Sequence, residues 1–173
     1  MARTIVREEG ADRLTLGHLA ERAGLSKPVI YDHFETRSVL LIALYRLIDM
    51  EVVDVFRNAM ARDPKGPEET VSMLSAAYIR CASKTDGEFQ AVGAALAGSE
   101  EKAVVFQELL DNCVQMFVEV LSAHSQLSDL ELTRCCVGLV GAGEALAGSL
   151  RRGRCRETEA IRTFNALIRA AIH

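Results

Sequence analysis

The chain has no tryptophan, only three prolines and few aromatic residues of any kind among its 173 residues. Its longest apolar stretches, such as residues 135–143, fall far short of the ~20 residues that span a bilayer. No charged segment followed by an apolar one opens the sequence. We therefore expect a protein that neither crosses a membrane nor is secreted, and we expect it in the cytoplasm. Because 49% of the residues are hydrophobic and 25% are charged, the composition is typical of a folded domain rather than a disordered tail.

Motifs of catalysis and metal binding are also missing. The four histidines form no HExxH or paired Glu-x-x-His pattern, and the chain has neither a nucleophile elbow nor a phosphate-binding loop. The five cysteines include no CxxC pair and have no histidines at zinc spacing. These absences predict a reduced protein that is not an enzyme and that uses no metal or cofactor.

The chain has fewer basic than acidic residues: 20 lysines and arginines against 24 aspartates and glutamates, a net charge of −4. Coating of nucleic acid by bulk charge is therefore disfavoured. Residues 1–46 nevertheless carry seven basic and six acidic side chains, a net charge of +1, which leaves −5 for the remainder. A slightly basic head on an acidic body can bind phosphate locally and repel it elsewhere.

Apolar residues recur at spacings of three and four along the chain, and no sustained alternation marks a strand. We therefore predict an all-α fold of about nine helices. A small head is expected over residues 1–46 and a larger helical domain over residues 47–173. The expected helix boundaries lie at residues 10–12, 24–26, 35–36, 63–67, 86–87, 98–99, 125–128 and 153–156, most of which contain glycine, proline, serine or aspartate.

Two short helices are expected to meet at a tight corner near the start of the chain. Thr15 offers an N-cap oxygen to the first helix, and Gly24 can end it in a left-handed conformation. Ser26 can then cap a second helix, whose first turn accepts Pro28 because the N–H that proline lacks is unpaired there anyway. The expected buried faces are Leu16, Leu19, Ala20 and Ala23 on the first helix, and Ile30 and Phe34 on the second. This pattern predicts a helix-turn-helix.

The second helix of this motif would expose side chains that suit the major groove of DNA. Lys27 and His33 can meet phosphates or base acceptors, and the Tyr31 hydroxyl can bond to a phosphate. Val29 can touch a thymine methyl group. Asp32 must accept from a cytosine amino group, pair with a nearby cation or turn away, because a carboxylate repels phosphate. The predicted DNA-binding residues are Thr15, Ser26, Lys27, Pro28, Val29, Tyr31, His33 and Arg37.

A further helix is expected to begin near Arg37 with Thr36 as its cap, and its first amides together with the guanidinium suit a phosphate. One segment that contains all of these positions, TLGHLAERAGLSKPVIYDHFETRSVLL (residues 15–41), closely resembles the DNA-binding signature of the TetR family of bacterial transcriptional regulators. The resemblance is specific over roughly residues 2–48 and only architectural beyond.

The resemblance implies a homodimeric repressor in which the amino-terminal three helices bind a palindromic operator. It also implies that the helical body binds a small hydrophobic effector. In this comparison Thr15 and Thr36 look like the family's capping hydroxyls, and Arg37 stands where the family often has a phosphate-binding lysine. Gly17 and His18 depart from the family's pattern, in which charged or polar residues are frequent at these sites.

Residues 129–152 are expected to form one long helix with a stripe of small residues. A glycine inside a helix costs about 1 kcal/mol relative to alanine, so several of them indicate a close helix approach. This helix and the last segment, residues 157–172, could form a four-helix bundle with the same pair from a second subunit, although packing within one chain would use the same residues. The predicted dimer residues are Gly138, Gly141, Ala142, Ala145, Gly148, Ser149, Ile161, Phe164 and Ile168.

Methionine and aromatic side chains are spread through the middle of the chain, and such side chains line apolar ligand pockets as well as ordinary cores. The residues predicted to line an effector pocket are Met50, Phe56, Met73, Tyr78, Phe89, Phe106, Cys113 and Phe117. An alternative function stays open, a dimeric helical interaction or redox-sensing protein whose DNA-binding head is vestigial. Adjacent Cys135 and Cys136 in one helix cannot readily bridge each other, and buried cysteines are usually inert. We therefore favour the DNA-binding regulator.

Overall fold

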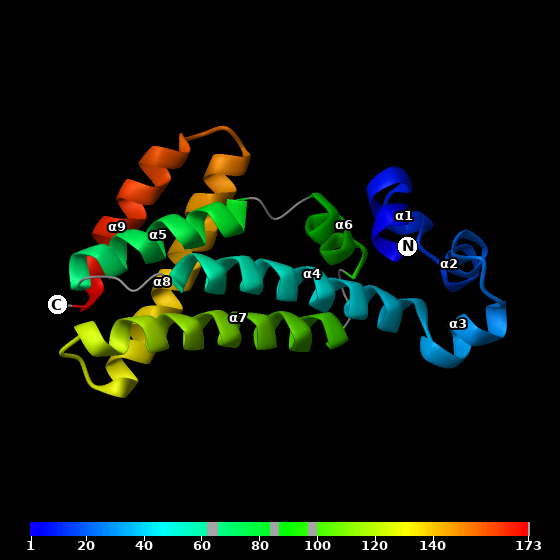
Figure 1. The fold of residues 1–173 in the computed structure, drawn as a ribbon, viewed down its shortest axis with the longest axis horizontal. Coiled ribbons are helices and arrows are strands. Elements are labelled where there is room, and N and C mark those ends of the chain that lie inside the picture. The colour runs from blue at the N-terminus through cyan, green and yellow to red at the C-terminus, as the bar shows by residue number, and fades with distance from the viewer. Residues whose placement is uncertain (62–65, 84–86, 97–99, 173) are drawn as a thin grey trace. The chain divides into compact units, whose positions relative to one another are not determined.

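The computed structural model describes residues 1–61, 66–83, 87–96 and 100–172, without the side chains of residues 87–90, 100 and 102. Over these ranges the chain forms nine α-helices and two short 3-10 turns, and it forms no strand (Figure 1). The all-α prediction is therefore confirmed. None of the helices in the described ranges has the length and apolar character needed to cross a membrane.

The residues divide into two compact units, Met1–Glu51 with Thr85–Phe106, and Val52–Lys84 with Gln107–His173. The sequence analysis places the boundary of the head after residue 46, whereas the first compact unit continues to Glu51 and also takes in a later segment of the chain. The reason is that α6 (Gly87–Ala95) packs against the first helix and the turn that follows it.

The first unit begins with α1 (Ala2–Glu9) and the 3-10 turn η1 (Ala11–Arg13). The pair α2 (Leu16–Ala23) and α3 (Lys27–His33) follows, and then the long helix α4 (Arg37–Met60) begins. The larger apolar side chains buried in this unit are Ile5, Val6, Leu14, Leu16, Leu19, Ile30, Leu40, Leu41, Leu44, Tyr45 and Ile48, with Val92, Leu96 and Val105 from its later segment.

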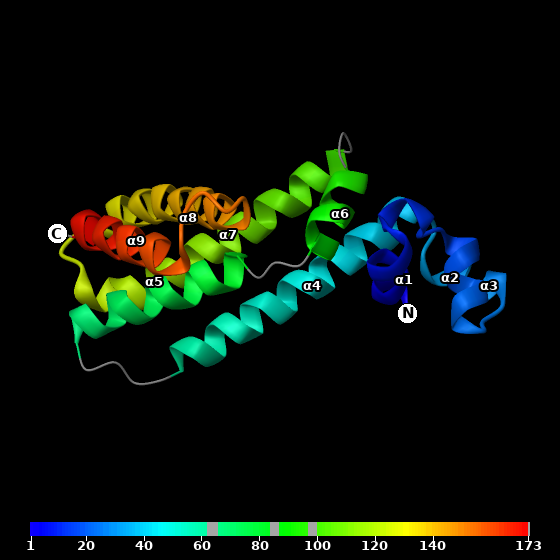
Figure 2. The ribbon, with the colours of Figure 1, turned by 90° about the horizontal axis from the view of Figure 1, so that it is seen from above.

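The second unit is built around α5 (Pro67–Ser83), α8 (Asp129–Arg151) and α9 (Glu157–Ile172), which pack together and lie side by side in both views (Figures 1 and 2). The remaining elements are the end of α4, most of α7 (Glu100–Leu121) and the turn η2 (Ser122–His124). The core of this unit is centred on the rings of Phe56, Tyr78, Phe117 and Phe164.

Candidate nucleic-acid interface

The start of α2 is capped as the sequence predicts. The Thr15 backbone is extended, and its hydroxyl oxygen accepts a hydrogen bond from the His18 N–H at 3.1 Å. This bond satisfies one of the amides that a helix leaves unpaired at its first turn. Leu16, Leu19 and Ala20 then point into the core, so α2 is anchored by its buried face.

A left-handed glycine forms the corner between α2 and α3. Gly24 has φ +66°, and its N–H donates to carbonyls of the last turn of α2 while the N–H of Leu25 reaches back to Ala20 at 3.0 Å. A residue with a Cβ atom rarely adopts this φ, so glycine at this position allows the chain to turn sharply. The predicted helix-turn-helix is therefore present in the structure.

Helix α3 presents almost all of its surface to solvent. Of its seven residues, Ile30 alone is buried, and Pro28 stands in the first turn as expected. Tyr31 is 51% exposed, and the ring of His33 packs edge-on against Phe34 at 4.8 Å between centroids. The Ser26 side chain makes no capping hydrogen bond, so the expectation that its hydroxyl caps α3 is wrong. The predicted contact residues that the structure exposes together are Ser26, Lys27, Pro28, Val29, Tyr31 and His33, with Asp32 between them.

The start of α4 includes the predicted cap Thr36, just before the helix, and the predicted DNA-binding residue Arg37, its first residue. The Thr36 hydroxyl accepts from the Val39 N–H at 3.2 Å, which confirms the expected cap. The Arg37 side chain is partly exposed, and its Nε donates to the backbone carbonyl of Leu14 and its Nη2 to that of Ala11, both at 2.8 Å. This arrangement has no local sequence signal, because a donor at residue 37 meets carbonyls more than twenty positions earlier.

An ion cluster joins α1 to α2, and the sequence analysis did not anticipate it. The Glu9 carboxylate contacts His18 Nε2 at 3.0 and 3.2 Å and accepts from Arg22 at 2.7 Å, while Glu8 accepts from the same guanidinium at 2.9 Å. The hydrogen bond from His18 is the main cause that lowers the pKa of Glu9 below its ordinary value. The i, i+4 spacing of His18 and Arg22 places both on one face of α2. His18, which departs from the family's pattern, thus has a structural partner in this chain.

Four of the eight predicted pocket residues belong to or pack against one cluster in the second unit. The ring of Phe117 lies 5.0 Å from that of Tyr78, edge-on, and 6.5 Å from that of Phe56, measured between centroids. The buried Tyr78 hydroxyl donates to the Glu144 carboxylate at 3.1 Å, and burial is the main cause that raises the pKa of Tyr78 above its ordinary value. Cys113 packs partly buried against the same cluster.

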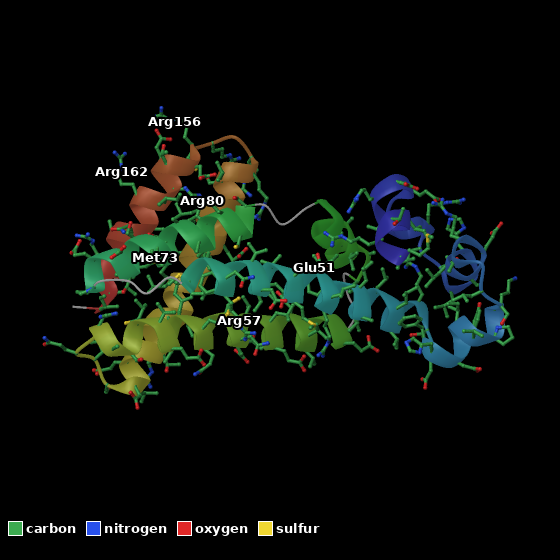
Figure 3. The ribbon with its side chains drawn as sticks, viewed as in Figure 1. Glu51, Arg57, Met73, Arg80, Arg156 and Arg162 are labelled. Carbon is green, nitrogen blue, oxygen red and sulfur yellow. The ribbon has the colours of Figure 1, made fainter. Side chains whose placement is uncertain are left out.

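The other predicted pocket residues do not join this cluster. Met73 is half-buried on α5, while Met50 and Phe106 belong to the first unit and are largely exposed. The side chain of Phe89 is outside the described residues. An open groove of about 170 Å³ lies next to the cluster and includes only Phe56 from the predicted set. Its lining residues are Phe56, Arg57 (Figure 3), Met60, Ala61, Met116, Glu119 and Val120.

The predicted dimer residues divide between two faces of α8 and α9. Gly138, Gly141 and Ala145 are exposed on α8, together with Val137, which is 58% exposed. Ala142, Ser149 and Ile161 are half-buried. Phe164 and Ile168 are buried in the protomer's own core, and Gly148 is buried beside the Arg151 and Arg152 side chains, so these three positions are already covered within the protomer.

The five cysteines are free thiols, and Cys136 is completely buried in the core of the second unit. Burial, assisted by neighbouring Cys135, raises the pKa of the Cys136 thiol to about 11. A thiol with so high a pKa is almost entirely protonated near neutral pH and is a poor nucleophile. This environment disfavours Cys136 as the reactive group of a redox sensor.

Comparisons with known proteins agree with this geometry. Residues 1–44 match the family model described as bacterial regulatory proteins, tetR family. No curated protein sequence matches the chain.

Solved structures share the fold along nearly the whole chain. A TetR-like transcriptional regulator from Rhodococcus sp. RHA1 is 20% identical, with a TM-score of 0.65, and the match covers 96% of this chain and 88% of that one. A regulator of the TetR/AcrR family from Thermobifida fusca YX-ER1 is 22% identical, with a TM-score of 0.66 and coverages of 96% and 91%. The fatty acid degradation regulator FadR from Bacillus halodurans is 18% identical, with a TM-score of 0.70 and coverages of 96% and 89%.

At these sequence identities the solved structures show the fold alone, and the family model applies only to residues 1–44. The helix-turn-helix with its exposed α3 coincides with the residues that the family model matches. The first 44 residues therefore match the tetR family of bacterial regulatory proteins, and the chain shares the all-helical fold of solved TetR-like regulators.

Proposed function

We propose that the protein is a repressor that binds a palindromic operator as a homodimer and leaves it when a small hydrophobic effector binds the body. The observation that carries the proposal is the exposure of α3. Six of its seven residues face solvent, and Tyr31 and Val29 among them contribute little to the protein's own core. A short helix held by one buried isoleucine and a glycine corner fits the role of a recognition helix in the major groove.

Within this proposal the exposed side chains of α3 divide into two kinds of contact. Lys27 and the Tyr31 hydroxyl are assigned to phosphates, which set the position of the helix on the duplex. Val29 and His33 are assigned to base edges, where a methyl group or a hydrogen-bond acceptor distinguishes one sequence from another. Two copies of α3 about 34–36 Å apart would enter successive major grooves, which is why a dimer and an inverted repeat belong together.

The experiment that tests DNA recognition is the selection of duplexes from a random pool by the purified full chain. We expect recovery of an inverted repeat. Recovery of no sequence above background would contradict the proposal.

Tyr31→Ala is expected to weaken binding to the selected duplex by about tenfold or more, because it removes an exposed groove contact and leaves the core intact. The measurement is a titration followed by fluorescence anisotropy, with circular dichroism to verify the helical content. Val39→Ala is the matched control, since Val39 is a similarly exposed side chain on α4 with no assigned contact. Equal affinities of the Tyr31 variant and the wild type would remove α3 from the interface.

The homodimer is proposed to form through the exposed side of α8, with α9 beside it. The support is a stripe of Gly138, Gly141 and Ala145 on which no side chain of the protomer packs closely, flanked by exposed Val137. A Cβ atom added at Gly138 or Gly141 would meet nothing within 4 Å in the protomer. Packing within the described protomer therefore does not explain why glycine, a poor helix former, stands at these two positions. A close approach of a second subunit would explain it.

Val137→Glu is expected to shift the protein from dimer to monomer, because a charge would be buried unpaired at the subunit contact. Sedimentation velocity at several protein concentrations measures this shift. Val55→Glu is the matched control, since Val55 is 60% exposed and lies on α4. Dimers of equal stability in both variants would place the subunit contact elsewhere.

The effector part of the proposal rests on the groove beside the aromatic cluster. Phe56, Met60 and Met116 provide flexible apolar walls, and the rim carries Arg57 and Glu119. An effector that prefers one body conformation lowers operator affinity by its differential affinity for the two states, commonly about 1–3 kcal/mol. Helix α4 is the proposed lever, because it begins in the first unit and ends in the second. A screen of small apolar compounds for a rise in melting temperature, followed by DNA release, tests this part.

A further inference from the structure

The Arg37 side chain is 37% exposed, and its guanidinium donates to backbone carbonyls of the head. Its Nε donates to the Leu14 carbonyl and its Nη2 to the Ala11 carbonyl, both at 2.8 Å, and Nη2 also lies 3.8 Å from the Asp12 carboxylate. Two donors of one rigid, planar group thus hold two carbonyls of the same turn. Such a pair fixes the direction of the guanidinium as well as its position.

The two carbonyls belong to the connection that starts the helix-turn-helix. Ala11 and Leu14 are buried, and Leu14 immediately precedes Thr15, the N-cap of α2. Arg37 therefore ties the first residue of α4 to the peptide from which α2 begins. At the other end of the motif, α3 is joined to α4 by only three residues, 34–36. The α2–α3 pair is thus held on α4 at both of its ends.

We infer that Arg37 is a positioning residue, whose guanidinium clamps η1 to the first turn of α4 and thereby sets how α2 and α3 are presented, and that it is not a phosphate ligand. The consequence for DNA recognition depends on the proposed function, whereas the clamp itself does not. Two of the five N–H donors of Arg37 are committed to the carbonyls, and the nearby Asp12 carboxylate would repel a phosphate placed at the remaining donors. Lysine is expected to hold the two carbonyls less firmly, because its ammonium group lacks the rigid planar fork of a guanidinium.

Three variants of the full chain test the inference: Arg37→Gln, Arg37→Lys and the control Arg13→Gln. Arg13 lies in the same turn and is exposed, so its variant removes the same charge without removing the two carbonyl bonds. The first measurement is hydrogen exchange of the amides of residues 16–20 without DNA. Both Arg37 variants should exchange about tenfold faster there, and the Arg13 variant should match the wild type. Unchanged exchange in Arg37→Gln, or protection restored by lysine, would overturn the clamp.

The second measurement is the salt dependence of binding to a short mixed-sequence duplex. A positioning residue lowers affinity by a similar factor at every salt concentration, so the slope of log affinity against log salt should equal that of the wild type. A phosphate ligand would lower the slope by about one unit when lost, and that result for Arg37→Gln would overturn the inference. If the wild type binds no duplex, the proposed function fails, and the exchange measurement still decides whether the clamp exists.

Discussion

Phe117→Ala is expected to lower the free energy of unfolding by about 3–5 kcal/mol, the range for removing a large aromatic side chain from a packed core. Phe117 is completely buried on α7, and its ring contacts those of Phe56, Tyr78 and Phe164. The three neighbouring rings come from three different helices, so no single side-chain movement can fill the space. The loss therefore includes both the transfer of the ring to water and the cavity that remains.

Urea unfolding followed by circular dichroism measures this change. Phe106→Ala is the matched control, because Phe106 lies on the same helix and is 47% exposed, so its loss should cost no more than about 1 kcal/mol. Similar costs for the two variants would mean that the aromatic cluster is not the core of the second unit. A small apolar compound such as benzene should also raise the melting temperature of the Phe117 variant more than that of the wild type, because a cavity lined by apolar side chains binds such molecules.

Gly143→Ala is expected to destabilise the protein by about 1–3 kcal/mol, although alanine is the better helix former by about 1 kcal/mol. A Cβ atom at position 143 would overlap Cε1 of Tyr78, and it would lie 2.8 Å from Cδ1 of the same ring and 3.0 Å from Cζ of Phe164. Both rings belong to the buried aromatic cluster and have little room to retreat. The steric cost of overpacking should therefore exceed the gain in helix propensity.

Gly141→Ala, two residues earlier on the same helix, should change stability in the opposite direction. A Cβ atom there would meet nothing within 4 Å, so the full helix-propensity gain of about 1 kcal/mol should appear in the unfolding curve of the monomer. If α8 forms the dimer contact, the same methyl group should weaken association, and the two effects separate when unfolding is measured at several protein concentrations. Destabilisation of the monomer by both variants would mean that Gly141 is packed inside the protomer.

The features of the candidate site that the sequence predicted correctly depend on interactions between residues close together in the chain. Thr15 and Thr36 accept hydrogen bonds from amides three residues ahead, and Gly24 adopts its left-handed conformation for reasons confined to one residue. Exposure of Tyr31 follows from the same logic, because Ile30 provides the short helix with its buried side. The predicted Ser26 cap was wrong although it is also a local feature. Ser26 has the extended backbone of an N-cap residue, but its side chain makes no capping hydrogen bond.

Whether an apolar stripe faces the protomer's own core or its surface could not be decided from the sequence pattern. Spacings of three and four place both Gly141 and Phe164 on apolar stripes, but they do not say whether a stripe meets the same chain or a second copy. The structure puts Phe164 in the protomer's own core and leaves Gly141 exposed. For the same reason the predicted pocket set combined Phe117, a core residue, with Met50, which is exposed on α4.

The sequence by itself determined the all-α fold, the helix-turn-helix and the surface that α3 offers, because helix periodicity, caps and a glycine corner act over a few residues. Tertiary structure alone decided the role of Arg37, the need for Gly143 and the partner of His18. Each of these depends on groups that are distant along the chain: the Leu14 carbonyl, the Tyr78 ring and the Glu9 carboxylate. A long flexible side chain such as arginine can reach a phosphate or a carbonyl equally well, and only the packing of α1, η1 and α4 brings the carbonyls within its reach.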